Sequence, residues 1–542
     1  LNATQKLVSM KSQSSEIRTK TLAYTDFPFL SKITLDYLDK HLDFKSFIRG
    51  FPSLEGLIGY GKTKSFSAQK RANLVQVLRQ QYSNFKPSET REQQLNLLAK
   101  DTSFCVTTGH QLSLLTGPLY FIYKIASIIH LSRQLNAAQN EFKAIPMFWM
   151  ASEDHDFEEI SEVDIFGKTY KWETKQKGAV GRMKVDELRP LLEQIKCQFG
   201  LSLEAQQVTN WIDKAFKKQT LSEAMLYLVD AIFEPYGLLI IEPDQAELKK
   251  EMQPYFKSEL EHETSYKAFQ GTIEHWPKAY KKQINARACN LFYLNEQHRG
   301  RLEKIDEINW KVDDSDLEFS QTELLDILEK HPERFSPNVA LRPLYQEVIL
   351  PNLAYIGGGG ELSYWFLLKG IFEQFEVDFP YLILRNSNLQ LTDKECNRIE
   401  NQTLFDWKDL LIETSEFEER ILKKTYQNTP AIQKLKADLE LSFEELKAVY
   451  PNQKAAFEHR EKAISKHLER TEHLLYKDWK RNQKLNLEHY IKTKELVFPK
   501  QNFQERQSNF IEFYLALGQD WIEQLVEHSD VFQQELHLNI RE

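Results

Sequence analysis

The sequence predicts an α/β protein with a parallel sheet at its core, followed by an α-helical coiled-coil arm. Two observations carry this prediction. Short apolar runs alternate with helical stretches as far as about residue 390, and such alternation is typical of βαβ units and a parallel sheet. From 391 to 497 the pattern is almost entirely helical and dense in Lys, Glu and Arg.

Five apolar runs are the expected strands of the core sheet. Each is short and ends in a polar or glycine-rich loop. In open parallel sheets, ligands bind beyond the carboxyl ends of the strands, so we expect the loops that follow these runs to share one site. The runs are Ser103–Thr108, Ile145–Met150, Gly237–Ile241, Leu353–Ile356 and Tyr381–Leu384.

The core is predicted to comprise residues 1–390. Its first part, residues 20–100, reads as helical. Two stretches near 163–220 and 255–335 interrupt the alternation of strands and helices, and we expect them to be insertions between core strands. The segment 498–542 is amphipathic and is expected to return to the core as helix.

Residues 391–497 are predicted to form the arm. Apolar residues there are spaced three, four, seven and three apart, which is typical of a coiled coil, and Pro430 and Pro451 mark breaks. A helical hairpin is the favoured interpretation, while a single long helix lying on the core stays an alternative. The spaced residues are Ile432, Leu435, Leu439, Leu446 and Val449.

Composition limits the classes of function. The net charge of −9 gives no support to nucleic-acid binding. No run reaches the ~18 apolar residues of a membrane-spanning helix, and no secretory signal is visible. The four cysteines are far apart and form no CxxC pair, which is typical of a protein of the reducing cytoplasm. Met10 is a candidate biological start.

Polar and glycine residues after the first strand form the first candidate site. A glycine there lets the backbone approach a ligand, and a helix starting at Pro118 would offer free N–H groups to phosphate or carboxylate. His110 could donate a proton near neutral pH. A plain turn with a capping threonine and a satisfied histidine is the alternative. The residues are Thr108, Gly109, His110, Gln111, Thr116 and Gly117.

Four titratable residues follow the second strand and form the second candidate site, with a predicted catalytic role. Such a cluster needs water, a metal or a substrate amine beside it. It could accept a proton from an ammonium nucleophile, whereas its spacing matches no recognised metal motif, so no metal ligands are assigned. A solvated loop that caps the next helix is the alternative. The residues are Glu153, Asp154, His155 and Asp156.

Four consecutive glycines in a glycine-poor chain form the third candidate site. They suggest close approach of the backbone to an anion, although no Lys-Ser/Thr pair follows as in a P-loop. A flexible strand-to-helix turn is the alternative. The residues are Gly357, Gly358, Gly359, Gly360 and Glu361.

Two further polar residues are candidates for substrate or nucleotide binding. Arg342 could form a bidentate pair with a carboxylate, and Asn386 follows the last strand within Arg385-Asn386-Ser387. A structural ion pair is an equally common use of a buried arginine. The pair Glu242 and Asp244 is a weaker candidate.

Four blocks of this sequence resemble the signature blocks of the bacillithiol biosynthesis BshC family, in the family's order and at similar spacing. The loop TGHQ stands where the family usually has TGQQ, and GGGGE where it usually has GGPGE, so the resemblance assigns no role to His110. The blocks are TTGHQLSLLTGPLYFIYK, IPMFWMASEDHDFEEI, FSPNVALRPLYQEVILPNLAYIGGGGELSYWFLLK and LVFPKQNFQERQSNF.

The resemblance implies a Rossmann-like, nucleotidyltransferase-like core akin to class I aminoacyl-tRNA synthetases, with two connecting insertions. It also implies a coiled-coil arm that forms a homodimer, with no nucleic-acid or membrane partner. The implied reaction is the last step of bacillithiol biosynthesis, in which a cysteine ligase joins the carboxyl group of L-cysteine to the glucosamine amine of glucosaminyl-malate.

Amide formation needs an activated carboxyl group, so ATP or ADP is the expected cofactor, and the need for Mg²⁺ stays open. The Gly109–Gly117 loop is expected to hold phosphate and Glu153–Asp156 to bind or deprotonate the amine. Gly357–Glu361 and Arg342 would close the site, with Arg342 beside malate. The synthetases' lysine-rich KMSKS loop is not evident, so a non-catalytic nucleotide-binding scaffold or regulatory module is the competing hypothesis. The clustered titratable groups favour an enzyme.

Overall fold

A computed structural model of the protein describes residues 18–26, 30–296, 298–426 and 430–541. The candidate start Met10 lies outside this part of the chain. The chain forms two compact units. One comprises residues up to Leu389 together with Glu505–Asn539, and the other comprises Gln390–Gln504 with Ile540–Glu542.

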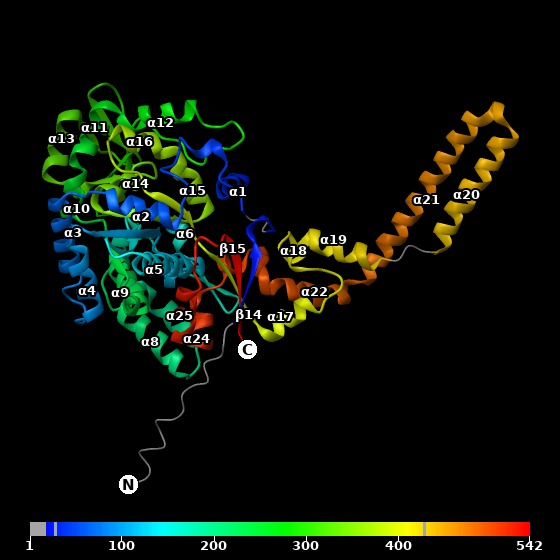
Figure 1. Ribbon diagram of the computed structural model, residues 1–542, viewed down its shortest axis with the longest axis horizontal. Helices are drawn as coiled ribbons and strands as arrows, with labels where there is room; N and C mark the ends of the chain where they lie inside the picture. Colours follow the sequence, from blue (N-terminus) through cyan, green and yellow to red (C-terminus); the bar gives the residue numbers. More distant parts are fainter. Residues whose placement is uncertain (1–17, 27–29, 297, 427–429, 542) are drawn as a thin grey trace, which may run out of the picture. The chain divides into compact units, whose positions relative to one another are not determined.

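The first unit is built on a five-stranded parallel sheet, as predicted (Figure 1). All five expected strands are present, and β2 runs two residues further than expected, to His110. The strands read as nearly continuous apolar runs because helices cover both faces of such a sheet. In spatial order they are β13 (Tyr381–Leu384), β12 (Asn352–Gly357), β2 (Ser103–His110), β3 (Lys143–Met150) and β6 (Leu239–Ile241).

The order of the strands reverses between β2 and β12. From β2 the chain moves through β3 to β6 in one direction, whereas from β12 it moves to β13 in the other. Since crossovers are right-handed, α5 (Tyr120–Ala138) and α15 (Gly359–Trp365) lie on opposite faces of the sheet. The carboxyl ends of β2 and β12 therefore form the switch point where α/β proteins bind ligands.

Helix α5 begins at Tyr120, two residues after Pro118, which corrects the expected start. The preceding residues Leu115, Thr116 and Gly117 all have positive φ, at 49°, 72° and 64°. A left-handed turn of this kind cannot be the first turn of a right-handed helix. An added Cβ at Gly117 would lie 2.6 Å from Cβ of Ser113, so glycine is required there for space as well as for φ.

The N-terminal region is helical, as expected, except for its first segment. Residues Arg18–Ala23 form strand β1, which belongs to a three-stranded sheet in the order β1-β15-β14. The helices are α1 (Lys32–Leu38), α2 (Leu54–Thr63), α3 (Ala68–Gln81) and α4 (Glu89–Leu98).

The C-terminal segment is helical only as far as α25 (Gln519–Glu527), which corrects the prediction of an all-helical return. It ends in β15 (Glu535–Arg541), next to β14 (Ser387–Thr392). Leu536, Leu538 and Ile540 alternate with polar residues and are buried, which is the period of a strand and not of a helix.

Both insertions contain small antiparallel sheets. The first carries β4 (Glu162–Ile165) and β5 (Lys168–Lys171), and one bridge joins Lys184 to Thr220. Its helices are α7 (Arg189–Lys196) and α8 (Leu203–Ala215). The strands of the second are β7 (Leu291–Leu294), β8 (Arg299–Lys304), β9 (Asn309–Val312), β10 (Glu318–Ser320) and β11 (Phe335–Pro337). Its helices are α11 (Gln253–His262), α12 (Thr264–Glu274) and α13 (Gln321–Lys330).

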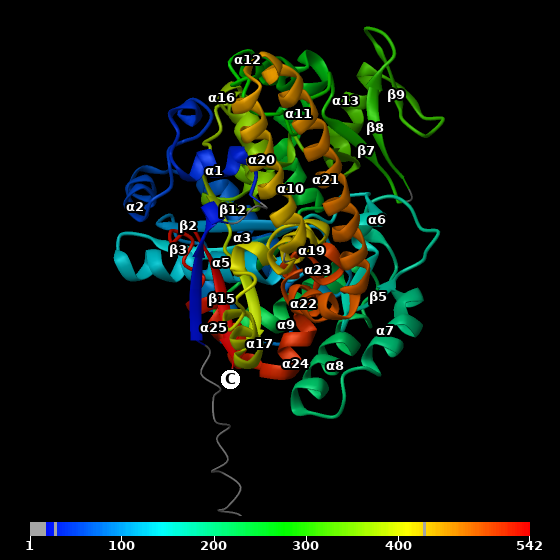
Figure 2. The ribbon, with the colours of Figure 1, turned by 90° about the vertical axis from the view of Figure 1, so that its right-hand side faces the viewer.

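The second unit contains a helical hairpin, so the hairpin interpretation of the arm is confirmed (Figures 1 and 2). Helix α20 (Pro430–Val449) turns at Pro451 and runs antiparallel to α21 (Lys454–Asn482). Lys436 pairs with Glu472 at 2.6 Å and Lys447 with Glu461 at 2.6 Å. The unit also holds α17 (Asp393–Glu400), α18 (Trp407–Leu410), α19 (Thr414–Thr425) and α22 (Lys484–Val497).

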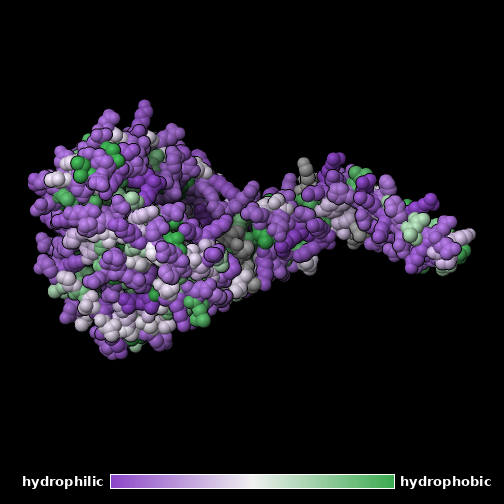
Figure 3. Space-filling view, turned by 90° about the horizontal axis from the view of Figure 1, so that it is seen from above, coloured by the Kyte–Doolittle hydropathy of each residue, from purple (hydrophilic) through white to green (hydrophobic). Residues whose placement is uncertain are grey.

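The visible face in Figure 3 is mostly hydrophilic, with hydrophobic residues scattered over it. On the hairpin, Leu441 and Val449 are 65% and 66% exposed. Over the described ranges, the structure has no helix of the length and apolar character needed to cross a membrane.

The return segment is anchored to the first unit by a buried ion pair. Arg385, directly after β13, donates to both carboxylate oxygens of Glu505, at 3.0 and 2.6 Å. The two side chains are 7% and 2% exposed. Asn509 adds a second anchor, since its amide donates to the carbonyls of Leu115 and Gly117 at 3.0 and 2.7 Å.

We expect Glu505→Ala to reduce the free energy of unfolding of this unit by about 3–5 kcal/mol, because it leaves the Arg385 guanidinium buried and unpaired. Urea unfolding followed by tryptophan fluorescence measures the effect. The double variant Arg385→Met/Glu505→Leu removes both charges and should recover much of the loss. A single variant as stable as the wild type would contradict the anchoring role.

Candidate functional site

The centre of the candidate site is a buried ion pair at the switch point. Lys124, on α5, donates to the carbonyl of Gly109 at 2.5 Å and to Glu361 at 2.7 Å. Glu361 also accepts from the Tyr355 hydroxyl and from the Gly358 N–H, both at 2.8 Å. These contacts tie together the ends of β2 and β12 and the start of α15.

The two partners respond differently to burial: it lowers the pKa of Lys124, whereas Glu361 keeps its charge near neutral pH. Burial raises the pKa of Glu361, but the charge and hydrogen bond of Lys124 outweigh it and lower the pKa to about 2. Glu361 is therefore ionised, and its lone pairs are directed to three protein donors. We interpret it as a residue that positions the two strand ends.

The glycine run is explained in part by contacts within the protein. None of Gly357, Gly358, Gly359 and Gly360 has positive φ. An added Cβ at Gly359 would lie 2.7 Å from Oγ1 of Thr34, and at Gly357 it would lie 3.0 Å from the Tyr355 ring, whereas nothing is close to Gly360. Because Glu361 takes the Gly358 N–H, this amide is not free for an anion, and anion binding by the run stays a prediction.

Arg342, at the start of α14 (Arg342–Ile349), carries an uncommitted donor. Its Nη1 donates to Gln346 at 3.2 Å, and Tyr364 interacts with the guanidinium and, against the effect of burial, helps to raise its pKa. By geometry, Nη2 is buried without a hydrogen-bond partner in the described chain. The guanidinium lies 5.7 Å from the ring of Trp149 and 5.6 Å from that of Tyr355. Buried donors are almost always satisfied, so this group is suited to a carboxylate or phosphate oxygen of a ligand.

His110 is half-buried between Tyr120 and Phe121 and bonds through Nδ1 to the carbonyl of Gln111 at 2.8 Å. Burial, followed by the charge of Lys124, lowers the pKa of His110 to about 4. The imidazole is therefore neutral near neutral pH, with a proton on Nδ1. It can offer Nε2 as an acceptor, and proton donation by His110 stays a prediction.

The loop after β3 places three of its four titratable residues in two networks. Glu153 is 7% exposed and pairs with Lys249 at 2.6 Å. Lys249, at the end of α10 (Ala246–Lys249), is fully buried and pairs with Asp244 at 2.9 Å. Arg182 completes the network with a bidentate bond to Asp244, at 2.7 and 2.9 Å.

The second network joins this loop to β2 and to the second insertion. Asp154 accepts from Gln111 at 2.9 Å and from the His155 N–H at 2.7 Å. Burial raises the pKa of Asp154, but hydrogen bonds from His155 and Gln111 outweigh it and hold the pKa well below its usual range. Arg299 on β8 donates to Nδ1 of His155 at 2.7 Å. Asp156 is exposed.

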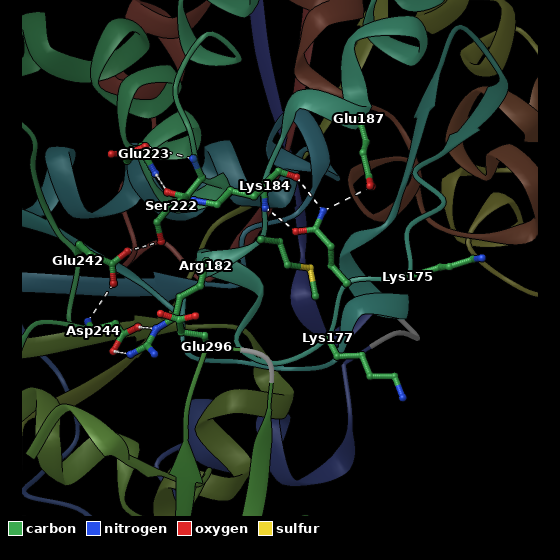
Figure 4. A pocket seen from close by; sticks show the side chains of 14 residues that line it. Lys175, Lys177, Arg182, Lys184, Glu187, Ser222, Glu223, Glu242, Asp244 and Glu296 are labelled. Carbon is green, nitrogen blue, oxygen red and sulfur yellow. Dashed lines mark hydrogen bonds and ion pairs between the residues drawn. The ribbon is translucent and has the colours of Figure 1, made fainter. Parts of the chain in front are cut away.

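A cavity of about 920 Å³ opens beside the end of β6 (Figure 4). Glu242 lines it, and its carboxylate accepts hydrogen bonds from the hydroxyls of Ser152 and Ser222, the latter on α9 (Leu221–Phe233). Burial, followed by the negative charge of Asp244, raises the pKa of Glu242 to about 7. Glu242 and Asp244 were weaker candidates in the sequence, and in the structure both line the cavity.

The remaining predicted residues bond within the protein. Thr108 is fully buried and donates to the carbonyl of Ile356 at 2.7 Å. Asn386 donates to the carbonyl of Asp530 at 2.9 Å and accepts from Ser127 at 3.1 Å. Thr116 and Gly117 are buried in the turn that Asn509 holds. The structure thus brings together Gly109, Gln111, Asp154, Arg342 and Glu361 at the sheet edge, with Thr108, Thr116 and Asn386 below its surface.

Sequence reasoning missed Lys124, Lys249 and Arg299. Lys124 had a signal, because it is the only charged residue in the apolar helical run YFIYKIASIIHL. Lys249 stands among other charged residues and had none. In the ranges that the structure describes, no three His, Cys, Asp or Glu side chains are grouped to hold a metal ion.

Comparison with known proteins gives matches over nearly the whole chain. The family model for the N-terminal Rossmann-like domain of bacillithiol biosynthesis BshC matches residues 16–386, and that for the C-terminal coiled-coil domain of BshC matches residues 389–539.

Relatives that carry the name cysteine ligase BshC are similar along most of their length. The one from Flavobacterium johnsoniae is 38% identical over 516 residues, which cover 94% of this chain and 97% of the relative. That from Flavobacterium psychrophilum is 38% identical, with 94% and 96% covered. That from Bacillus cereus strain B4264 is 26% identical over 481 residues, with 85% and 88% covered.

Replacement of Glu361 by Gln tests the ion pair with Lys124 through its pH dependence. Because the folded pKa of about 2 lies below the ordinary value of 4.5, the contribution is present at neutral pH and is lost as the pH falls from about 5 towards 2. A shift of this size corresponds to roughly 3 kcal/mol. We expect the thermal unfolding midpoint of Glu361→Gln to lie below that of the wild type at pH 7, and the difference to shrink at pH 3. The exposed Glu173→Gln is the control, and an equal difference for Glu361→Gln at both pH values would argue against the pair.

Proposed function

Since this chain belongs to the BshC family of bacillithiol biosynthesis, we propose that it is a cysteine ligase that joins the carboxyl group of L-cysteine to the amine of glucosaminyl-malate. The match over both domains carries the proposal. A ligase of this kind forms one C–N bond between two small molecules, and the sheet edge carries groups suited to both reactants.

The uncommitted Nη2 of Arg342 is the group best placed to bind a substrate carboxylate or phosphate. The loop after β3 offers carboxylates for the amine, which must be unprotonated when it attacks the carboxyl carbon. Of these, Asp154 faces Gln111 and Asp156 is exposed, while Glu153 is neutralised by Lys249. We therefore assign the amine-facing role to Asp154 and Asp156 ahead of Glu153.

We propose ATP as the source of the activated carboxyl group. When bound, it would supply a leaving group better than hydroxide to the carboxyl of cysteine. Arg342 is the residue whose free donor fits phosphate, whereas the buried Thr116–Gly117 turn and the occupied Gly358 N–H do not form an open cradle for it. We propose Mg²⁺ together with ATP.

We also propose a homodimer formed through the hairpin, in the cytoplasm. Exposed apolar residues on the hairpin support the dimer, because a pair of helices alone leaves them in water. No disulfide joins the four cysteines, which all lie in the described part of the chain, and three of them are buried; this supports a reducing compartment. The residues that favour the dimer are Leu435, Leu441, Leu446, Val449, Ile464 and Leu475.

Mass spectrometry of the purified protein with cysteine and glucosaminyl-malate tests the function. We expect the amide product with ATP and Mg²⁺, and none with a non-hydrolysable ATP analogue, because the activation step consumes a phosphate bond. Product without any nucleotide would contradict activation by ATP. No product under any condition would favour the alternative of a nucleotide-binding scaffold.

The variant Asp154→Asn tests the role of the loop after β3. Asparagine can still accept the backbone N–H of His155, so the loop should keep its shape, but it removes the negative charge that faces the amine. We expect turnover to fall by roughly tenfold or more, because hydrogen bonds to charged groups are the stronger ones. Glu158→Gln on α6 (Phe157–Ile160), whose side chain is 78% exposed, is the control. Unchanged turnover of a folded Asp154→Asn would remove its assigned role.

A further inference from the structure

The cavity beside β6 has two chemically different ends. Glu242 forms one end, and the exposed Lys175 and Lys177 lie on the side of the cavity away from it (Figure 4). In the described chain, neither lysine has an ion pair. The cavity therefore has the carboxylate of Glu242 at one end and the two lysines, with Glu187 on the same side, at the other.

Glu242 differs from its acidic neighbour in lacking a cation. Asp244 is neutralised by Arg182 and Lys249. The donors to Glu242 are the hydroxyls of Ser152 and Ser222 and the N–H of Asp244, and no cation pairs with it among the described residues. A buried carboxylate with neutral donors and a free cavity beside it is suited to an ammonium group. The raised pKa of Glu242, about 7, is consistent with the absence of a cation.

The cavity lies on the same edge of the sheet as Arg342. Ile241, directly before Glu242, pairs with Trp149, which pairs with Gly109 on β2. At the usual strand spacing, Glu242 is roughly 10 Å from β2. Tyr345, one turn after Arg342 on α14, donates to the carbonyl of Pro243 at 2.7 Å. Glu242 and Arg342 therefore belong to the same edge of the sheet, on neighbouring elements that the Tyr345 bond joins.

We propose that this cavity binds the acceptor substrate, an amino sugar that bears carboxylates, with its ammonium at Glu242 and its carboxylates at Lys175 and Lys177. The inference rests on the proposed function and specifies where its acceptor binds. In this assignment Glu242 holds the ammonium when the acceptor binds, and Asp154 and Asp156 face the amine during the reaction. Arg342 is left for the carboxyl group of cysteine, whereas the sequence assigned it to malate.

Calorimetric titration of the full-length protein, without cysteine or nucleotide, tests each end separately. We expect Glu242→Gln to weaken binding of glucosaminyl-malate by roughly 10- to 100-fold, and binding of its N-acetylated form, which has no ammonium, to be unchanged. We expect the double variant Lys175→Ala/Lys177→Ala to bind glucosaminyl-malate roughly tenfold more weakly. Its affinity for methyl glucosaminide, which has no carboxylate, should be unchanged.

Two controls and the contrary outcomes complete the design. Lys86→Ala, an exposed lysine elsewhere, and Arg342→Lys should both leave the binding of glucosaminyl-malate unchanged. Three outcomes would overturn the cavity assignment. A variant could lose the same affinity for both ligands of its pair, both cavity variants could keep the wild-type affinity, or the wild type could fail to bind glucosaminyl-malate. The proposed function is judged separately, by product formation with the wild-type protein. Since the lysine variant lies on an exposed loop, it decides the question even where Glu242→Gln does not fold.

Discussion

The buried ion pair of Lys124 and Glu361 is the interaction on which the rest of the site depends. It lies where the strand order reverses, and it joins the carbonyl of Gly109 at the end of β2 to the carboxylate that follows β12. Taking two charges out of water is costly, and it is tolerated here because the Glu361 carboxylate meets three donors. We interpret the ion pair as one that holds the two strand ends in place, while neighbouring residues contact the substrates.

The same logic governs the other side of the sheet edge. Lys249 has no exposure and holds Glu153 and Asp244 together, so two loops that are distant in sequence keep one arrangement. Two groups at this sheet edge keep capacity for a ligand. They are Nη2 of Arg342, which lacks a partner, and the carboxylate of Glu242, which lacks a cation. A binding site is built most simply from such groups, since binding a ligand there satisfies what folding left open.

Much of the fold could be predicted because it depends on local patterns. Each core strand is a short apolar run bounded by polar loops, and the hairpin follows from the spacing of apolar residues and the break at Pro451. Local patterns failed where tertiary contacts decide the conformation. The turn at Leu115–Gly117 delays α5 beyond Pro118, because Asn509, nearly four hundred positions further along the chain, holds its carbonyls.

By itself the sequence determined the order of the strands along the chain, the loops and helices that follow the strands, and the family of the protein. These features follow from local patterns of neighbouring residues. The tertiary structure alone decided the pairing of charges. Lys124 meets Glu361, Lys249 meets Glu153, and Arg385 meets Glu505 across long separations in the chain. Whether a carboxylate is a structural partner or a free ligand group depends on such pairings, because the neighbour in space, and not the neighbour in sequence, sets its charge and its remaining hydrogen-bonding capacity.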